Sequence, residues 1–217
     1  MSDIVKEYWR TKLDTVCLAL ERNRFDAHVA ENMEDAQRLV WEELVPPLNG
    51  GTVSWGGSMT LKDAGLKRKF FESPDWEVID VDNRELSPEE RLERRRQSLL
   101  ADLYFLGSNA LIEDGRLVNL DMIGNRVAAL TFGPKKVVVL VGRNKVCADL
   151  DSAMRRVRDY ASPANARRLS MATPCAQTSM CHDCSSEQRI CNNWTITEKS
   201  FPEHRISVVL INEDLGL

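Results

Sequence analysis

The run Val137-Val-Val-Leu-Val141 constrains the fold of this 217-residue chain more than any other stretch. Five apolar, mostly β-branched residues in succession leave no polar face, which is typical of a strand buried on both sides. Such strands occur in largely parallel sheets whose two faces are covered by helices. We therefore place this run at the centre of a parallel sheet and expect the rest of the chain to alternate between strands and helices.

The other hydrophobic patterns alternate in this way. Helical periodicity predicts helices at residues 4–20, 33–44, 87–101, 124–132 and 149–160, and one that carries Leu61, Leu66 and Phe70. Short apolar runs predict strands at residues 25–30, 51–56, 76–81, 103–108, 135–142, 194–197 and 206–211. An Asp-Gly turn of type I′ predicts a hairpin over residues 110–119. This order favours a layered α/β fold, with a largely parallel sheet flanked by helices.

Composition and charge indicate how many domains the chain forms and which partners it is unlikely to bind. With 43% hydrophobic and 29% charged residues, we expect one folded domain over residues 1–217, with an N-terminal helical part at 1–48 and a cysteine-rich loop at 170–195. A net charge of −4 on a chain with scattered basic residues argues against nucleic acid as a partner. No apolar stretch approaches the roughly 20 residues of a membrane span. The N-terminus lacks the basic-then-apolar order of a secretion signal, so we expect a cytoplasmic protein.

Four cysteines are concentrated near the C-terminus: Cys175, Cys181, Cys184 and Cys191. Cytoplasmic thiols are reduced, so clustered cysteines there are more often metal ligands than disulfides. Their C-x5-C-x2-C-x6-C spacing matches neither ferredoxin spacing nor the zinc ribbon, and both a [4Fe–4S] cluster and zinc are open as the cofactor. A redox disulfide pair, or thiols that only pack, is the alternative.

Three polar segments are candidates for binding a small carboxylate or phosphate. The first is a glycine turn between a strand and a helix, where backbone N–H groups can hold an anion. The second follows the hairpin, and the third follows the central strand, at the end where open α/β sheets bind ligands. We expect them to meet at one edge of the sheet and to supply the ligand-binding residues Gly56, Gly57, Ser58, Asn119, Asp121, Asn125, Arg126, Asn144 and Lys145.

Two of these segments also have a purely structural interpretation. Ser58 can act as the N-cap of the following helix, so that the glycine pair is only a tight turn. Asn125 can cap the next helix while Asp121 and Arg126 form an ion pair. The sequence leaves these interpretations open beside the binding hypothesis.

Motifs in these segments together resemble the lactate-utilisation (LUD) family. They are Ser54-x-Gly-Gly-Ser-Met-Thr60, Asn109-Ala-x-x-Glu-Asp-Gly-x-Leu-x-Asn119, Gly124-Asn-Arg-Val-Ala-Ala129, Phe132-Gly-Pro-Lys135 and Val141-Gly-x-Asn-Lys145. The tail, from Pro174-Cys175 to Ile190-Cys191, is similar to the cysteine-bearing, single-domain branch of that family. The match covers most of the chain from about residue 50 onward, whereas the first helices agree in pattern only.

The resemblance implies a fold similar to the ribose-5-phosphate isomerase and CoA-transferase superfamily. It also implies a link to L-lactate oxidation, in which family members act with iron–sulfur partner proteins. It assigns no catalytic residue and does not decide whether the chain is an enzyme. The leading hypothesis is an accessory or electron-transfer protein of L-lactate or related organic-acid oxidation. The alternatives are a stand-alone enzyme acting on a small phosphorylated or CoA-linked carboxylate, and a regulatory or binding module with structural zinc.

We predict that protein purified without oxygen contains stoichiometric iron or zinc bound by the four cysteines. Metal binding supplies local folding energy, so Cys184→Ser should release the metal and loosen residues 170–195 while the central strand stays protected. Metal analysis measures the release of the metal, and hydrogen exchange measures the loosening of residues 170–195. Cys17→Ser, outside the segment, is the matched control. Anaerobic protein without either metal would contradict the metal site.

Overall fold

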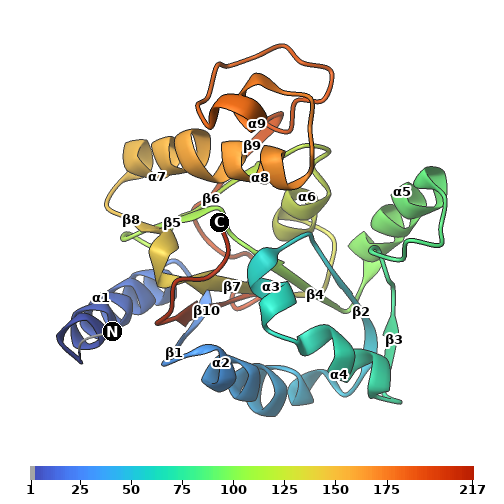
Figure 1. Cartoon of the computed structure of the whole chain (residues 1–217). Helices are drawn as coiled ribbons and strands as arrows, with labels where there is room; N and C mark the ends of the chain where they lie inside the picture. The colour runs from blue at the N-terminus through green and yellow to red at the C-terminus, as the bar shows by residue number, and fades with distance from the viewer. Residues whose placement is uncertain (1–2) are drawn as a thin grey trace.

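A computed structural model describes residues 3–217, and its centre is a six-stranded sheet (Figure 1). Met1 and Ser2, at the start of the stretch in which we found no secretion signal, lie outside the described residues. All neighbouring strands of the sheet are parallel. Their order is β1 (Asp26–Ala30), β10 (Ile206–Ile211), β7 (Lys136–Gly142), β4 (Leu103–Gly107), β2 (Gly51–Trp55) and β3 (Trp76–Val78). The predicted buried strand is β7, and its central position is confirmed.

Helices cover both faces of this sheet, as the hydrophobic periodicity predicts. The α-helices of the described residues are α1 (Asp3–Arg22), α2 (Met33–Leu39), α3 (Met59–Asp63), α4 (Leu66–Glu72), α5 (Pro88–Gln97), α6 (Asn125–Thr131), α7 (Leu150–Arg156), α8 (Ser162–Arg168) and α9 (Pro174–Thr178). The expected α/β fold, with a largely parallel sheet flanked by helices, is therefore confirmed. Within residues 3–217, no helix is both long and apolar enough to cross a membrane.

The side chains of β7 alternate between two hydrophobic cores. Val138 and Leu140 pack on one face with residues of α2, α3 and α4. Val137, Val139 and Val141 pack on the other face with residues of α1 and α6. All five are fully buried. Both faces of β7 are covered, so apolar side chains are stabilised by burial on each face. This explains the uninterrupted apolar run.

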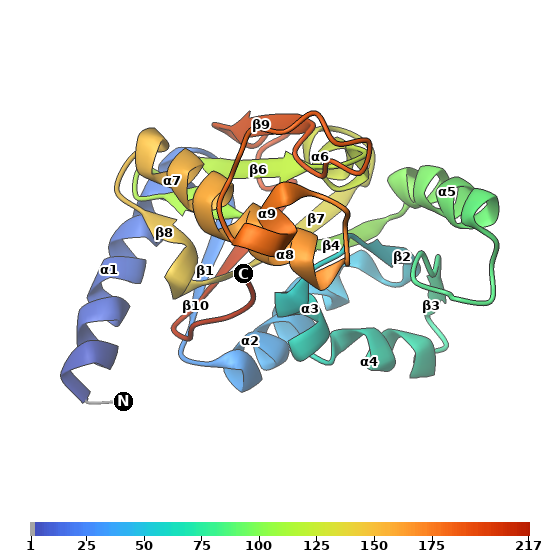
Figure 2. The ribbon, with the colours of Figure 1, turned by 45° about the horizontal axis from the view of Figure 1, so that its top comes forward.

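A second, smaller sheet packs on the first and was not expected as a separate unit. Its strands are, in order, β8 (Val146–Cys147), β5 (Ala110–Ile112), β6 (Leu117–Asp121) and β9 (Asn193–Thr197). Leu111 and Leu117 join the core that contains α1, whereas Ile112 and Val118 pack against α7. Figures 1 and 2 accordingly show α7, α8 and α9 on the side of the small sheet, and α2, α3 and α4 on the far side of the large one.

The hairpin expected over residues 110–119 forms from β5 and β6, but its turn is not of type I′. That turn needs a positive φ at both central residues, whereas only Gly115 in this turn has one, at 87°. Asp114 instead accepts hydrogen bonds from the backbone N–H and the guanidinium of Arg116. Glycine is needed here for a second reason, because a Cβ on Gly115 would lie 2.8 Å from backbone atoms of Ala19 in α1.

Other elements also differ from the sequence-based expectation, among them the short strand β8 and helix α9, which were not predicted. The helix predicted to carry Leu61, Leu66 and Phe70 is divided into α3 and α4, because Gly65 between them adopts a left-handed conformation with φ of 59°. Helix α8 was not predicted at all. Its Pro163 lies in the first turn, where proline is tolerated because no helical N–H is needed.

Candidate ligand-binding site and cysteine segment

Segments at the carboxyl ends of several strands surround a pocket of about 500 Å³. Gly57 and Ser58 follow β2, Gly107 ends β4 and Lys145 follows β7, so the parallel order brings them to one edge of the large sheet. The end of β6 and the start of α6 supply a further wall, and α8 with the segment after it contributes another. The three polar segments singled out in the sequence thus line one pocket.

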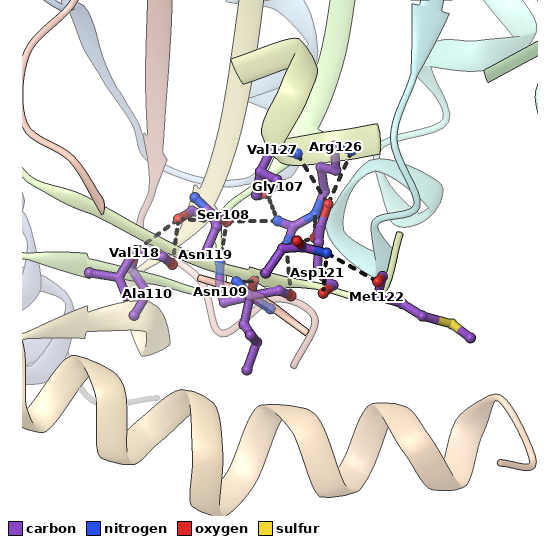
Figure 3. A network of polar contacts seen from close by, with 12 residues as sticks. Gly107, Ser108, Asn109, Ala110, Val118, Asn119, Asp121, Met122, Arg126 and Val127 are labelled. Carbon is purple, nitrogen blue, oxygen red and sulfur yellow. Dashed lines mark hydrogen bonds and ion pairs between the residues drawn. The ribbon is translucent and has the colours of Figure 1, made fainter. Parts of the chain in front are cut away.

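A buried guanidinium connects these walls (Figure 3). Arg126 donates from Nε and Nη2 to Oδ1 of Asp121, at 2.9 and 2.6 Å. Its Nη1 donates to Oδ1 of Asn119 at 2.7 Å and to the carbonyl of Gly107 at 2.6 Å. Its Nη2 also reaches Oδ1 of Asn109 at 2.6 Å. Every guanidinium nitrogen therefore has a protein acceptor, and Arg126 shapes the pocket rather than offering a free donor to a ligand.

Asp121 also fixes the start of α6. Its Oδ2 accepts the backbone N–H groups of Arg126 and Val127, each at 3.1 Å. The N-cap is Gly124 in a left-handed conformation, with no capping side chain of its own. The expected cap by Asn125 is therefore wrong, whereas the expected ion pair between Asp121 and Arg126 is confirmed. Asn125 lines the pocket instead.

Small and capping residues let the strand ends approach one another. Ser58 caps α3, as its structural interpretation predicts, because its Oγ accepts the N–H of Leu61 at 3.2 Å. A Cβ on Gly107 would lie 2.7 Å from that same Oγ, and a Cβ on Gly56 would lie 3.0 Å from Cγ of Arg126. Larger side chains at these two glycines would push the glycine turn away from β4 and α6.

Lys145 brings a buried amine to the pocket. Only 4% of the residue is exposed, and Nζ donates to Oγ1 of Thr60 at 3.2 Å. No carboxylate of residues 3–217 forms an ion pair with it. Burial, and after it the positive charges of Arg156 and Arg126, lower the pKa of Lys145 from 10.5 to about 7. The amine is therefore present in both its charged and its neutral form near neutral pH.

The structure places most of the predicted ligand-binding residues on the pocket wall, namely Gly57, Ser58, Asp121, Asn125, Arg126 and Lys145. The other three support the wall from behind. Gly56 packs on Arg126, and Asn119 accepts a hydrogen bond from it. Asn144 holds the C-terminal segment, because its Oδ1 accepts the N–H of Leu215 at 3.0 Å.

The sequence suggests an anion-binding face on the helix that carries Arg95, with a solvated, self-paired surface as the alternative, but it does not reveal the other cations that reach the pocket region from distant helices. Arg95 of α5 and Arg168 of α8 line the pocket. Arg156 of α7, whose charge acts on Lys145, donates to the carbonyl of Asn109 at 2.6 Å. No local pattern assigns these arginines to the pocket, because exposed helix faces carry similar residues and only long-range packing brings these three to the site.

The cysteine-rich segment borders the same pocket. Met171 and Ile190, which directly precedes Cys191, are lining residues. Arg189 holds this segment together by donating from Nη1 to the carbonyl of Cys184 and from Nε to that of Cys191. The segment is thus organised by hydrogen bonds to its backbone rather than by a hydrophobic core of its own.

The four cysteines fit a metal centre in kind and number, but they are not gathered into one. No disulfide joins the cysteines of the described chain. Burial raises the pKa of the Cys191 thiol; of its neighbours, Ser162 and Arg189 lower this pKa, whereas Cys175 and Cys181 raise it. Within residues 3–217, however, no three His, Cys, Asp or Glu side chains are arranged to hold a metal ion. The segment would have to close around a metal before four thiolates could bind it.

The fold and the pocket together define a layered α/β protein with a polar site at the carboxyl ends of its parallel strands. The chain belongs to the LUD domain family, whose model matches residues 14–211. The resemblance drawn from the sequence motifs is thereby confirmed, and with it a relation to lactate-utilisation proteins.

Among solved structures, the chain is similar to a DUF162 family protein from Deinococcus radiodurans. The two are 14% identical, the match covers 95% of this chain and 98% of that chain, and the TM-score is 0.47. A likeness at this level carries no argument about function. Comparison with curated proteins gives no match.

We predict that Arg126→Met lowers the free energy of unfolding by about 3–5 kcal/mol, because it leaves the buried Asp121 carboxylate without its counter-ion. Arg96→Met is the control, since its exposed ion pair with Glu93 should contribute less than about 1 kcal/mol. Urea unfolding followed by circular dichroism gives both values. Equally small effects in the two variants would show that the buried network contributes little to stability.

Lys145→Met is predicted to stabilise the protein, most strongly below pH 7. The pKa of Lys145 is about 7 in the folded chain and about 10.4 in an unfolded chain, so the folded state binds fewer protons between these values. The free energy of unfolding of the native protein should therefore rise with pH across this window, by an amount on the order of a few kcal/mol.

Because methionine does not titrate, the advantage of Lys145→Met should shrink as the pH rises from about 6 to about 10. Urea unfolding at several pH values measures the difference in free energy of unfolding between Lys145→Met and the native protein. Lys62→Met, at an exposed lysine, is the control. A difference between native protein and Lys145→Met that does not change with pH would contradict the lowered pKa.

Proposed function

We propose that this LUD domain binds a small organic-acid anion in the pocket and acts as an accessory or electron-transfer protein in the oxidation of L-lactate or a related acid. In this proposal iron–sulfur proteins are its partners, and a [4Fe–4S] cluster, with zinc as the alternative, is held by Cys175, Cys181, Cys184 and Cys191. The observation that carries the proposal is the buried amine of Lys145, without a carboxylate partner among residues 3–217, in a pocket bordered by the cysteine segment.

The cations at and near Lys145 favour an anionic ligand. Asp121 neutralises Arg126, but among residues 3–217 no carboxylate pairs with Lys145 or Arg156. A buried cation is costly to keep without a counter-ion. A ligand carboxylate would supply that counter-ion, and the side-chain amide of Asn125 on the same pocket wall adds a further donor.

The position of the cysteine segment supports the redox part of the proposal. Ser162 lines the pocket and lies close enough to Cys191 to lower the pKa of its thiol, so a ligand and a centre held by the four thiolates would share one wall. An iron–sulfur cluster would supply electron transfer at this wall, whereas zinc would be structural. The identity of the metal therefore decides between an electron-transfer role and a regulatory module with structural zinc.

The volume of the pocket and two arginines that line it also fit a second function, with a larger ligand. A volume of about 500 Å³ exceeds what lactate requires, since pockets of about 300–1,000 Å³ hold much larger ligands. Arg95 and Arg168 line it, and neither pairs with a carboxylate of residues 3–217. Arginine is well suited to phosphate groups. A stand-alone enzyme acting on a small phosphorylated or CoA-linked carboxylate is therefore the alternative function.

We predict that L-lactate binds to the native chain and that Lys145→Met weakens this binding about tenfold or more, the effect of losing a charged hydrogen bond of about 1.5–3 kcal/mol. Isothermal titration calorimetry at about pH 6, where the amine is largely protonated, measures both dissociation constants. Lys62→Met should bind L-lactate as the native chain does. An anaerobic absorbance spectrum of the same sample separates a cluster, which absorbs in the visible, from zinc, which does not.

Three results would change this conclusion. A failure of L-lactate to bind would contradict the proposed ligand, and tighter binding of an acyl-CoA or a sugar phosphate would favour the second candidate. Unchanged binding by Lys145→Met would remove Lys145 from the site.

A further inference from the structure

Lys145 has a second chemical property beyond its charge. With a pKa of about 7, a large share of its amine is unprotonated at neutral pH. An ordinary exposed lysine, with a pKa of about 10.4, is almost entirely protonated there. An unprotonated lysine amine in a desolvated pocket is a nucleophile toward carbonyl carbon.

Neighbouring groups hold this amine in place. Thr60, itself fully buried, accepts a hydrogen bond from Nζ. Gly216, with φ of 64°, passes so close that a Cβ there would lie 3.3 Å from Nζ and 2.8 Å from Oγ1 of Thr60. Two charged groups, Arg156 from α7 and Arg126 from α6, act on the amine, and both disfavour its protonation. The amine is thus fixed on the pocket wall and shielded from bulk water.

We infer that Lys145 forms a reversible imine with a 2-oxo carboxylate bound in the pocket. The lone pair of Nζ attacks the carbonyl carbon and gives a carbinolamine. A C=N bond then forms as the former carbonyl oxygen leaves with the two amine hydrogens as water. No electrons are gained or lost, so the step needs neither an oxidant nor a reductant, and addition of water reverses it.

The pocket favours a 2-oxo acid over other carbonyl compounds, because groups other than the attacking amine can hold its carboxylate. Asn125 and Arg168 line the same pocket. The guanidinium of Arg168 contacts Asn165 and pairs with no carboxylate of residues 3–217. A 2-oxo acid is also the product of oxidising a 2-hydroxy acid such as lactate, so this inference rests on the proposed function and specifies which form of the substrate the site would retain.

The test treats the native chain with pyruvate and sodium cyanoborohydride, which reduces an imine to a stable secondary amine. Peptide mass mapping should locate the adduct at Lys145, at about tenfold or more the level at any exposed lysine, because exposed amines are protonated. L-Lactate, which has the carboxylate but no carbonyl, should give no adduct. Acetone, which has the carbonyl but no carboxylate, should label Lys145 far less than pyruvate does.

The variants and a binding measurement separate the outcomes. Lys62→Met should keep the adduct and Lys145→Met should lose it. An adduct spread equally over exposed lysines, or retained in Lys145→Met, would overturn the imine. Pyruvate that binds by calorimetry but is never trapped would overturn the imine and leave the proposed function standing, whereas failure of both pyruvate and L-lactate to bind would overturn both. Mapping on the native chain identifies the labelled residue even if a variant does not fold.

Discussion

The buried ion pair of Arg126 and Asp121 connects the two sheets of this protein, and the shape of the pocket depends on it. Asp121 ends β6 in the small sheet, whereas Arg126 begins α6 and reaches the carbonyl of Gly107 at the end of β4 in the large sheet. A buried ion pair stabilises a fold only when its remaining donors and acceptors are satisfied. Here the hydrogen bonds that satisfy the guanidinium are the same ones that fix the two sheets relative to each other.

Two cations near this sheet edge have different roles because their surroundings differ. Arg126 has a carboxylate and several carbonyl or amide oxygens around it, so its charge is compensated within the protein. Lys145 has one hydroxyl partner, Thr60, and two neighbouring guanidinium groups that disfavour its charge. A compensated cation holds the structure together, whereas an uncompensated one favours an external anion or loses its proton. In the proposed function, this contrast makes Lys145, rather than the better-connected Arg126, the group that binds the small organic acid.

In the cysteine segment, the sequence signal and the observed structure differ. The spacing of the four cysteines suggests a metal site. In the described residues, Arg189 holds the segment by donating to backbone carbonyls, and no three potential ligands lie together. Thiolates repel one another and are costly to bury together without a cation. Four thiolates could therefore converge in this segment only around a cation, and the lining residues Ser162 and Ile190 would place such a centre beside the pocket.

The sequence by itself determined most of the strand and helix order, the central place of β7 and the segments that carry the polar site, because periodicity and strand ends are local properties. The tertiary structure decided what each polar residue does. Asp121 rather than Asn125 caps α6, the hairpin joins a separate sheet, and Arg156 approaches Lys145 from a distant helix. The last two of these outcomes depend on distances between segments far apart in the chain, whereas the first depends on the left-handed turn at Gly124 that brings Asp121 back to the start of α6. The charge state of a buried amine, above all, is set by the sum of burial and neighbouring charges, which no single stretch of sequence contains.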